Sequence, residues 1–375
     1  MILYQLLVIF FIALIFFIPL QVDIRINYII YAFAICLLPI FVKNIREDVK
    51  AGEKITLFFI LFLIANGFST IFAQDQERSI LQLFLYQSYF VIFVSIRSVF
   101  SSEKSKELLV TGYLLLVTVL SLISLYNTLI LKYVNRHAEG VSFMWNYFGH
   151  NHLSALLIFA IPLNFYLLNK YWKDRIWKIL LLVTSALLLI SLFFSFGLGS
   201  MICLAISAIL VLAWKKNIYT VVAVIVILST FLMGSLFINR EFGLSKKPIS
   251  SIEGRIGYWK KGIINFQENP IFGVGLVSNK VNYAEDGKIV IRNFYAHSFI
   301  IQNLSDSGLL GLINSLILIG TVFFKGFKIF KNNLYLAVWI GLLASTLNAL
   351  VDFDWQVASV FLIFWIFAGV LKHAE

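Results

Sequence analysis

The chain has 375 residues, of which 60% are hydrophobic and only 13% are charged, with a formal net charge of +11 at pH 7. Soluble domains carry about a quarter charged residues, so this composition excludes an ordinary soluble protein and predicts a chain that lies in lipid. In such a protein the positive charge indicates basic cytoplasmic loops and a site for an anionic ligand, rather than nucleic-acid binding.

Long apolar runs recur along the chain, and each transmembrane helix needs about 20 such residues. The first run, MILYQLLVIFFIALIFFIPL, has no basic leading region and no small-residue cleavage site. It is therefore predicted to be a retained span and not a cleaved signal peptide. The sequence predicts an all-α polytopic membrane protein with about 12 transmembrane helices: 2–20, 26–42, 55–73, 80–97, 108–131, 153–169, 176–194, 198–213, 217–238, 298–324, 334–350 and 355–372.

Basic residues predict the orientation of these spans, because short cytoplasmic loops are rich in lysine and arginine. The loops assigned to the cytoplasm carry Lys43, Arg46, Lys50, Lys54, Arg97, Lys104, Lys106, Lys170, Lys173, Arg175, Lys178, Lys215, Lys216, Lys325, Lys328, Lys331 and Lys372. The short loops on the other side carry Arg25, Arg78, Lys132 and Arg136. Both termini are then cytoplasmic. Three regions follow: helices 1 to 9 in residues 1–238, an external loop in 239–297, and helices 10 to 12 in 298–375.

The external loop, 239–297, is the one long connection, and it is basic. A merely solvated surface is one explanation, because long loops escape the charge rule. A more specific one comes from residues 254–267: if they are helical, Arg255 and Trp259 lie on one face with Tyr258 beside them. Tyrosine and tryptophan favour the headgroup level of a membrane, and arginine can bind phosphate through two parallel hydrogen bonds. The sequence therefore predicts an interfacial helix that holds Arg255 at phosphate depth.

The residues after Trp259 continue and then end this helix. Lys260 and Lys261 either add positive charge to the site or lie among lipid headgroups. Pro270 then disfavours further helix, and Gly273 and Gly275 permit a tight turn.

His297 marks the start of the tenth predicted span, and polar residues follow it inside an apolar run. Histidine is the natural group for moving a proton near neutral pH, although an interfacial histidine bonded to a carbonyl is the simpler explanation. Gln302, Asn303 and Asp306 are expected to face the bundle interior or a wet cavity.

Two further clusters lie at predicted external helix ends. His150 and His152 are poorly spaced to bind one metal ion and no other ligand completes a set, so a polar helix start or an acceptor-side surface is expected instead. Asp352 and Asp354 suggest a metal site for a sugar-phosphate donor, a general base, or simply acidic residues at a helix start.

Four stretches, taken in this order, resemble the O-antigen ligase/O-antigen polymerase superfamily of bacterial membrane glycosyltransferases. They are NYFGHNHLSALLIFAIPL from Asn146, GRIGYWKKGIINFQENPIFGVGL from Gly254, AHSFIIQNLSDSGLLGLI from Ala296 and LVDFDWQVASVFLIFWIFAGVL from Leu350. Together they cover most of residues 146–372, and the second and third at their mutual spacing are the specific signal.

The resemblance implies a GT-C-like, metal-independent, inverting enzyme without a cofactor, in the bacterial cytoplasmic membrane. It would take a glycan from an undecaprenyl-pyrophosphate carrier at the outer face of that membrane. A ligase would pass the glycan to a lipid A core sugar, and a polymerase to another repeat unit. The implied partners are the lipid-linked donor, the sugar acceptor and membrane lipid, with no nucleic acid.

The resemblance also implies roles for individual residues: Arg255 would bind the pyrophosphate and His297 would activate the acceptor hydroxyl. The candidate substrate-binding residues are Arg240, Tyr258, Trp259, Lys260, Arg292, His150, His152 and Asp352. The family often has a Ser-Arg-Gly element at the start of the eighth span, whereas residues 193–200 read FFSFGLGS without arginine. Arg240 and Arg292 are candidate replacements, and the departure indicates a divergent branch.

Two other functions fit a chain of this composition. A transporter or flippase of lipid-linked oligosaccharide would carry charged residues near the middle of several spans and would have discontinuous helices there. A non-catalytic partner of an envelope assembly complex is the third reading.

Overall fold

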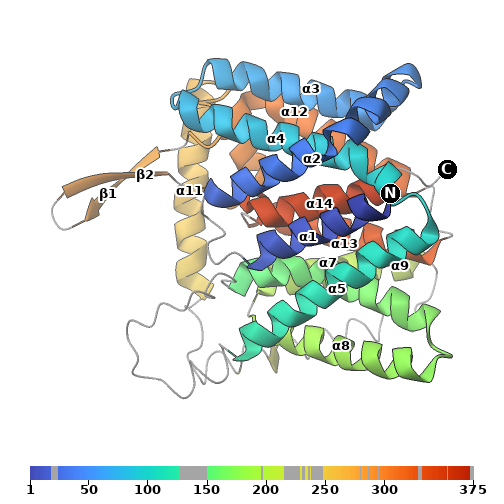
Figure 1. The fold of residues 1–375 in the computed structure, drawn as a ribbon. Helices are drawn as coiled ribbons and strands as arrows, with labels where there is room; N and C mark the ends of the chain where they lie inside the picture. Colours follow the sequence, from blue (N-terminus) through green and yellow to red (C-terminus); the bar gives the residue numbers. More distant parts are fainter. Residues whose placement is uncertain are drawn as a thin grey trace.

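The computed structural model describes residues 1–17, 24–126, 150–195, 197–214, 248–278, 280–285, 288–293, 295–327, 332–352 and 354–371, with isolated positions between 229 and 237. Within these ranges the chain forms a bundle of roughly aligned helices (Figure 1). The ninth predicted span, 217–238, lies outside the described residues except for those isolated positions.

The remaining predicted spans correspond, in order, to helices of the bundle. These are α1 (Ile2–Phe17), α2 (Ile24–Lys50), α3 (Lys54–Ile71), α4 (Gln76–Val99), α5 (Glu103–Leu125), α7 (His150–Lys170), α8 (Arg175–Phe194), α9 (Leu198–Trp214), α12 (Phe299–Phe327), α13 (Asn333–Ala349) and α14 (Ala358–Leu371). Among the described residues, 7 helices are long and apolar enough to cross a membrane, and α1, α9, α13 and α14 are shorter apolar helices. The helical class is confirmed, while the full number of spans stays a prediction.

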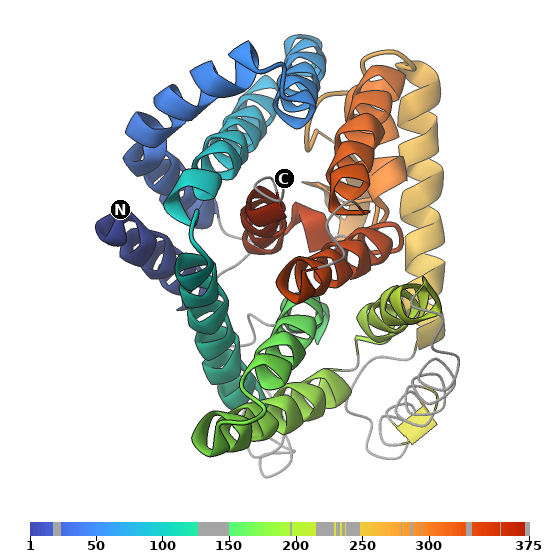
Figure 2. The same ribbon diagram turned by 90° about the vertical axis from the view of Figure 1, so that its right-hand side faces the viewer.

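Helix α14 lies in the centre of the bundle (Figure 2), and every one of its residues is buried. A helix that is hydrophobic on all sides is stable only when neighbours surround it. The Trp365 ring packs against Phe59 at 4.5 Å and Phe93 at 5.7 Å between centroids, which joins α14 to α3 and α4. Large apolar side chains also cover the outside, as at Ile176 and Val183 of α8, which are 72% and 63% exposed. Apolar residues on both the inside and the outside fit a bundle surrounded by lipid.

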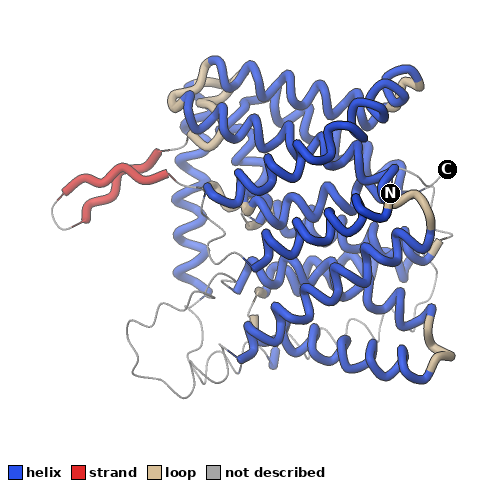
Figure 3. The backbone as a smooth tube through the Cα atoms, in the orientation of Figure 1, coloured by secondary structure: helices blue, strands red, loops and turns tan. Residues whose placement is uncertain are grey.

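Two elements stand apart from the bundle axis at one of its ends. Helix α11 (Pro248–Glu268) runs across the ends of the bundle helices, whereas α1 begins and α14 ends at the opposite end (Figure 1). Its presence confirms the helix predicted over 254–267. Strands β1 (Lys280–Glu285) and β2 (Lys288–Asn293) form an antiparallel hairpin, with Lys280 paired to Asn293, that projects away from the helices (Figure 3).

One residue interrupts the tenth span. The span predicted over 298–324 corresponds to α12, but Gly308 in α12 has φ 61° and ψ −159° and interrupts the helix. Glycine tolerates this backbone because it has no Cβ, and a Cβ here would lie 2.4 Å from the carbonyl oxygen of Ile271. The predicted span is therefore present, and a glycine with a docked neighbour permits a break within it that the hydrophobic pattern does not show.

The turn that follows α11 fills this break. Leu309 N–H donates to the Pro270 carbonyl at 2.9 Å, and Val274 N–H donates to the Ser305 carbonyl at the same distance. A turn that satisfies the broken helix's backbone groups removes most of the cost of breaking a helix inside a membrane. The predicted tight turn is confirmed, since Gly273 and Gly275 have φ values of 69° and 102°.

Candidate active site

The carboxylate of Asp352 lies between Arg255 and His297. Arg255 Nη2 donates to Asp352 Oδ2 at 3.1 Å, and its Nη1 donates to the carbonyl oxygen of Val351 at 2.8 Å. His297 Nδ1 lies 3.3 Å from Asp352 Oδ1. The three side chains come from α11, from the segment before α12 and from the connection between α13 and α14. One carboxylate thus brings together two residues to which the sequence assigned separate roles.

The hydrogen bond between His297 Nδ1 and Asp352 requires one particular tautomer of the imidazole. When Nδ1 carries the proton and donates it to Asp352, the lone pair lies on Nε2. Nε2 is then the ring atom that is able to accept a proton. The Asp352 side chain is 7% exposed, whereas Arg255 and His297 are 24% and 23% exposed. The carboxylate is therefore buried behind two groups that a ligand can reach.

His297 has an uncommon backbone conformation that its neighbours hold in place. Its φ is 50°, in the left-handed region that costs a non-glycine residue about 1–3 kcal/mol. The Ala296 N–H donates to Gln302 Oε1 at 2.7 Å, which fixes the turn that enters α12. The Tyr258 ring stacks on the imidazole, with centroids 5.6 Å apart and an interplanar angle of 13°. Tyr258 and Arg255 are one turn apart on α11, so one helix face presents both to His297.

A second carboxylate, Asp354, lies behind the first. It begins the short 3₁₀ helix η2 (Asp354–Gln356) and is 1% exposed. Asn348 Nδ2 donates to Asp354 Oδ2, and His152 Nδ1 of α7 lies 3.9 Å from Asp354 Oδ1. Burial, and next the negative charge of Asp352, raise the pKa of Asp354 well above its ordinary value.

The structure brings four of the predicted site residues together: Arg255, Tyr258, His297 and Asp352. His152 is buried beside Asp354, although a surface position was one expectation. Lys260 is exposed on α11, and Trp259 is partly buried. Arg240 and the side chains of Arg292 and His150 lie outside the described part of the structure. The role of each residue stays a prediction.

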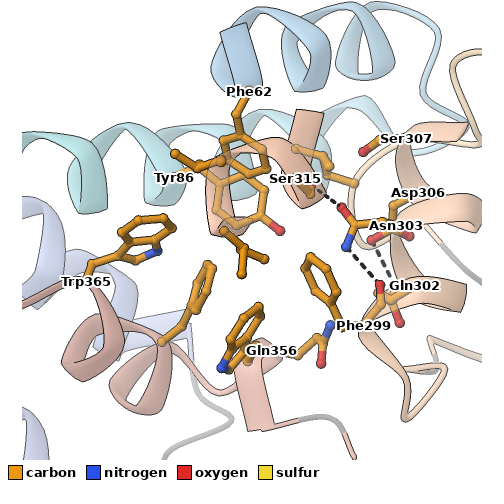
Figure 4. Close-up of a pocket in the computed structure, with 15 residues that line it drawn as sticks. Phe62, Tyr86, Phe299, Gln302, Asn303, Asp306, Ser307, Ser315, Gln356 and Trp365 are labelled. Carbon is orange, nitrogen blue, oxygen red and sulfur yellow. Dashed lines mark hydrogen bonds between the residues drawn. The ribbon is translucent and has the colours of Figure 1, made fainter. Parts of the chain in front are cut away.

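The polar residues after His297 line a separate small cavity inside the bundle (Figure 4). Gln302 Nε2 donates to Asp306 Oδ2 at 2.9 Å, and Ser315 Oγ donates to Asn303 Oδ1 at 2.8 Å. The cavity measures about 30 Å³, room for roughly two water molecules but not for a sugar ring. The expectation that these residues face the interior is confirmed, and their cavity is too small to be the substrate site.

The segment without the family's arginine is tightly packed. A Cβ on Gly197 would lie 2.2 Å from Ser154 Oγ, and one on Gly199 would lie 2.9 Å from Asn348 Oδ1. Ser154 and Ser200 also share a hydrogen bond at 2.9 Å. Small residues are therefore needed at Gly197 and Gly199, the two described glycines of this turn.

Apolar helices around a partly exposed arginine–carboxylate–histidine group define a multi-pass membrane protein with a polar site at one end of its bundle. Residues 183–316 match the family model described as O-antigen ligase. The match includes Arg255, Tyr258 and His297 and ends before Asp352. It confirms the resemblance of the chain to the O-antigen ligase/O-antigen polymerase superfamily, whose substrates are in general a lipid-linked glycan and an acceptor. No curated protein sequence matches the chain significantly.

Proposed function

We propose that this protein transfers a glycan from an undecaprenyl-pyrophosphate carrier to an acceptor sugar at the outer face of the bacterial cytoplasmic membrane. The observation that carries the proposal is the Asp352 carboxylate, which holds the Arg255 guanidinium and the His297 imidazole beside one another. A fixed cation next to a fixed proton acceptor is the pair that a displacement of pyrophosphate needs.

The reaction assigned to this site is a single displacement. His297 Nε2 takes the proton of an acceptor hydroxyl, and the oxygen attacks the anomeric carbon of the donor glycan. The bond from that carbon to the pyrophosphate breaks, and the leaving pyrophosphate takes the electron pair. Attack opposite the leaving group inverts the anomeric centre.

Charge stabilisation in this proposal comes from Arg255, without a metal ion. Negative charge grows on the pyrophosphate as it leaves, and a guanidinium can bind two of its oxygens at once. Arg255 gives two of its hydrogen bonds to Val351 and Asp352, which fixes its plane before the donor binds. The Nδ1 bond of His297 to Asp352 stabilises the imidazolium that forms during transfer.

Orientation in the membrane belongs to the same proposal. Helix α11 crosses the bundle end and exposes Ile256, Ile263 and Ile264, each more than 40%. These residues suit a helix that lies in the headgroup region with its lysines among phosphates. The proposal places this end outside and both termini in the cytoplasm, as the basic loops predict. Ligase and polymerase are equal variants of the proposal, because the residues of the described site favour neither acceptor.

A transporter or flippase of lipid-linked oligosaccharide is the alternative, and the break of α12 at Gly308 favours it, because discontinuous helices are common in transporters. In the described residues, however, the turn after α11 forms hydrogen bonds with the backbone groups at this break, so those groups are not free to bind an ion. The glycosyltransferase therefore fits the site better.

The test uses the full-length protein, purified in detergent, with a lipid-pyrophosphate-linked glycan donor and separate core-sugar and repeat-unit acceptors. Arg255→Ala and His297→Ala are expected to abolish transfer, while Arg175→Ala, at an exposed position beginning α8, should leave it unchanged. Full activity in both site variants would refute the site. Movement of intact donor across vesicles, without transfer, would establish the transporter instead.

A further inference from the structure

The connection between α13 and α14 carries two buried carboxylates, and each faces a histidine from a different part of the chain. Asp352 is 6% exposed and faces His297, and Asp354 is 1% exposed and faces His152 of α7. Only the first pair is part of the reaction proposed above, so the second needs its own explanation.

The two carboxylates differ in what compensates their charge. Asp352 has a full cationic partner, since Arg255 Nη2 is 3.1 Å from its Oδ2. Asp354 Oδ2 accepts from the neutral amide of Asn348. Asp354 Oδ1 has no hydrogen-bond partner among the described residues, and His152 Nδ1 lies 3.9 Å from it. Two ionised carboxylates this close in a buried loop would repel each other, so one of them is expected to give up its charge.

The direction of titration agrees with this geometry. Burial raises the pKa of Asp354 well above its ordinary value, and the neighbouring charge of Asp352 raises it further. The Asn348 amide and the more distant Arg255 act in the opposite sense but do not reverse it. Asp354 is therefore the member of the pair that retains a proton.

Building on the proposed function, we propose that His152 and Asp354 hold one proton between them and thereby keep Asp352 as the only net negative charge behind Arg255 and His297. The proton resides on either group, and in both cases the pair is neutral overall. Its loss places a second negative charge close to the bound pyrophosphate and weakens that binding. His152 and Asp354 are thus positioning residues that act through Asp352 and do not touch the substrate.

Other groups that face Asp354 have to be separated from this effect. They are Asp352 on the same connection, Arg255 on α11, His152 on α7 and the Cys203 thiol on α9, which lies within electrostatic reach of both carboxylates. Arginine does not titrate in proteins, whereas ionisation of the Cys203 thiol would imitate loss of the shared proton.

The experiment measures binding of farnesyl pyrophosphate, a short lipid pyrophosphate, to the purified full-length protein by calorimetry from about pH 6.5 to about pH 9.5, below the ordinary titration of lysine. In the native protein the affinity should fall roughly tenfold once the shared proton is lost, which is the Coulomb effect of one added charge at an assumed separation of about 10 Å. Asp354→Asn keeps the shape of the side chain but cannot ionise. The affinity of this variant should therefore stay constant over the pH range in which the native affinity falls. An identical fall in Asp354→Asn overturns the proposal.

Three further variants separate the outcomes. Arg255→Ala should lose binding at every pH. Normal binding by this variant would refute the proposed function, whatever the result for the proton shared by His152 and Asp354. Cys203→Ser should show the native fall, and a level profile in this variant would assign the effect to the thiol and overturn the inference. His152→Gln leaves the proton to Asp354 alone, so the fall should move to lower pH. An unchanged His152→Gln profile also overturns the proposal, even if Asp354→Asn does not fold.

Discussion

Replacing Asp352 by asparagine tests how Arg255 and His297 are oriented, because it removes the charge and keeps the shape. The native carboxylate accepts from Arg255 Nη2 at 3.1 Å and lies 3.3 Å from His297 Nδ1. Breaking a buried charged pair costs about 3–5 kcal/mol. The lower end applies here, since Arg255 and His297 are about a quarter exposed and water replaces part of the interaction. If an energy of about 3 kcal/mol is lost from the transition state, kcat/KM falls roughly a hundredfold.

The assay follows initial rates of glycan transfer by the purified protein over a range of donor concentrations. The donor KM should rise, because Arg255 is no longer held toward the pyrophosphate, and kcat should fall, because His297 loses its tautomer and orientation. Asp48→Asn is the matched control. Asp48 is a buried carboxylate that accepts from Arg97 and from Thr56 Oγ1, where α2 and α4 end. The Asp48→Asn substitution should lower the Tm and leave kcat per folded molecule unchanged. Native kcat and KM in Asp352→Asn would refute the orienting role.

Three other changes have defined outcomes. Gly308→Ala should destabilise the protein by about 2–4 kcal/mol, from left-handed strain and overlap with a backbone carbonyl, whereas Gly320→Ala, where a Cβ meets nothing within 4 Å, should leave the Tm unchanged. Arg255→Lys keeps the charge but not the planar fork, so the donor KM should rise roughly tenfold with a smaller change in kcat; an unchanged KM would contradict bidentate binding. Tyr258→Phe should retain kcat, while Tyr258→Ala should lower it about threefold to tenfold, because a stacked aromatic pair contributes about 0.5–1.5 kcal/mol. Equal kcat values in these two variants would show that the stacking on His297 is unimportant.

The helices were predictable because a membrane allows few alternatives. Each span has to satisfy its own backbone hydrogen bonds in lipid, so apolar length alone indicates where it lies. Helix α11 was predictable for a different reason: arginine, tyrosine and tryptophan at helical spacing precede a proline and two glycines. The β hairpin also has a local sequence signal that the predicted elements did not include: Asp286-Gly287 between the two strand segments favours a two-residue turn.

The contact between Arg255 and Asp352 was not predictable in the same way. The two residues are 97 positions apart, and the sequence left Asp352 open to metal binding, base catalysis or a helix start. Which carboxylate faces which cation depends on how α11 crosses the bundle, and local spacing says nothing about that crossing. The break at Gly308 was hidden for a related reason: glycine is common in transmembrane helices, and the turn that stabilises the break lies far away in the chain.

The broken helix and the site are connected through α11. Four backbone hydrogen bonds join the turn after α11 to residues 305–310, and Asn265 Nδ2 of α11 donates to Ser305 Oγ at 3.0 Å. These bonds fix one end of α11 on α12, while Arg255 near its other end is bonded to Val351 and Asp352. A helix held at both ends keeps the guanidinium in place, as the proposed electrostatic role of Arg255 requires. Gly308→Ala should therefore raise the donor KM in the molecules that remain folded. A lower Tm with an unchanged KM would mean that the break serves stability alone.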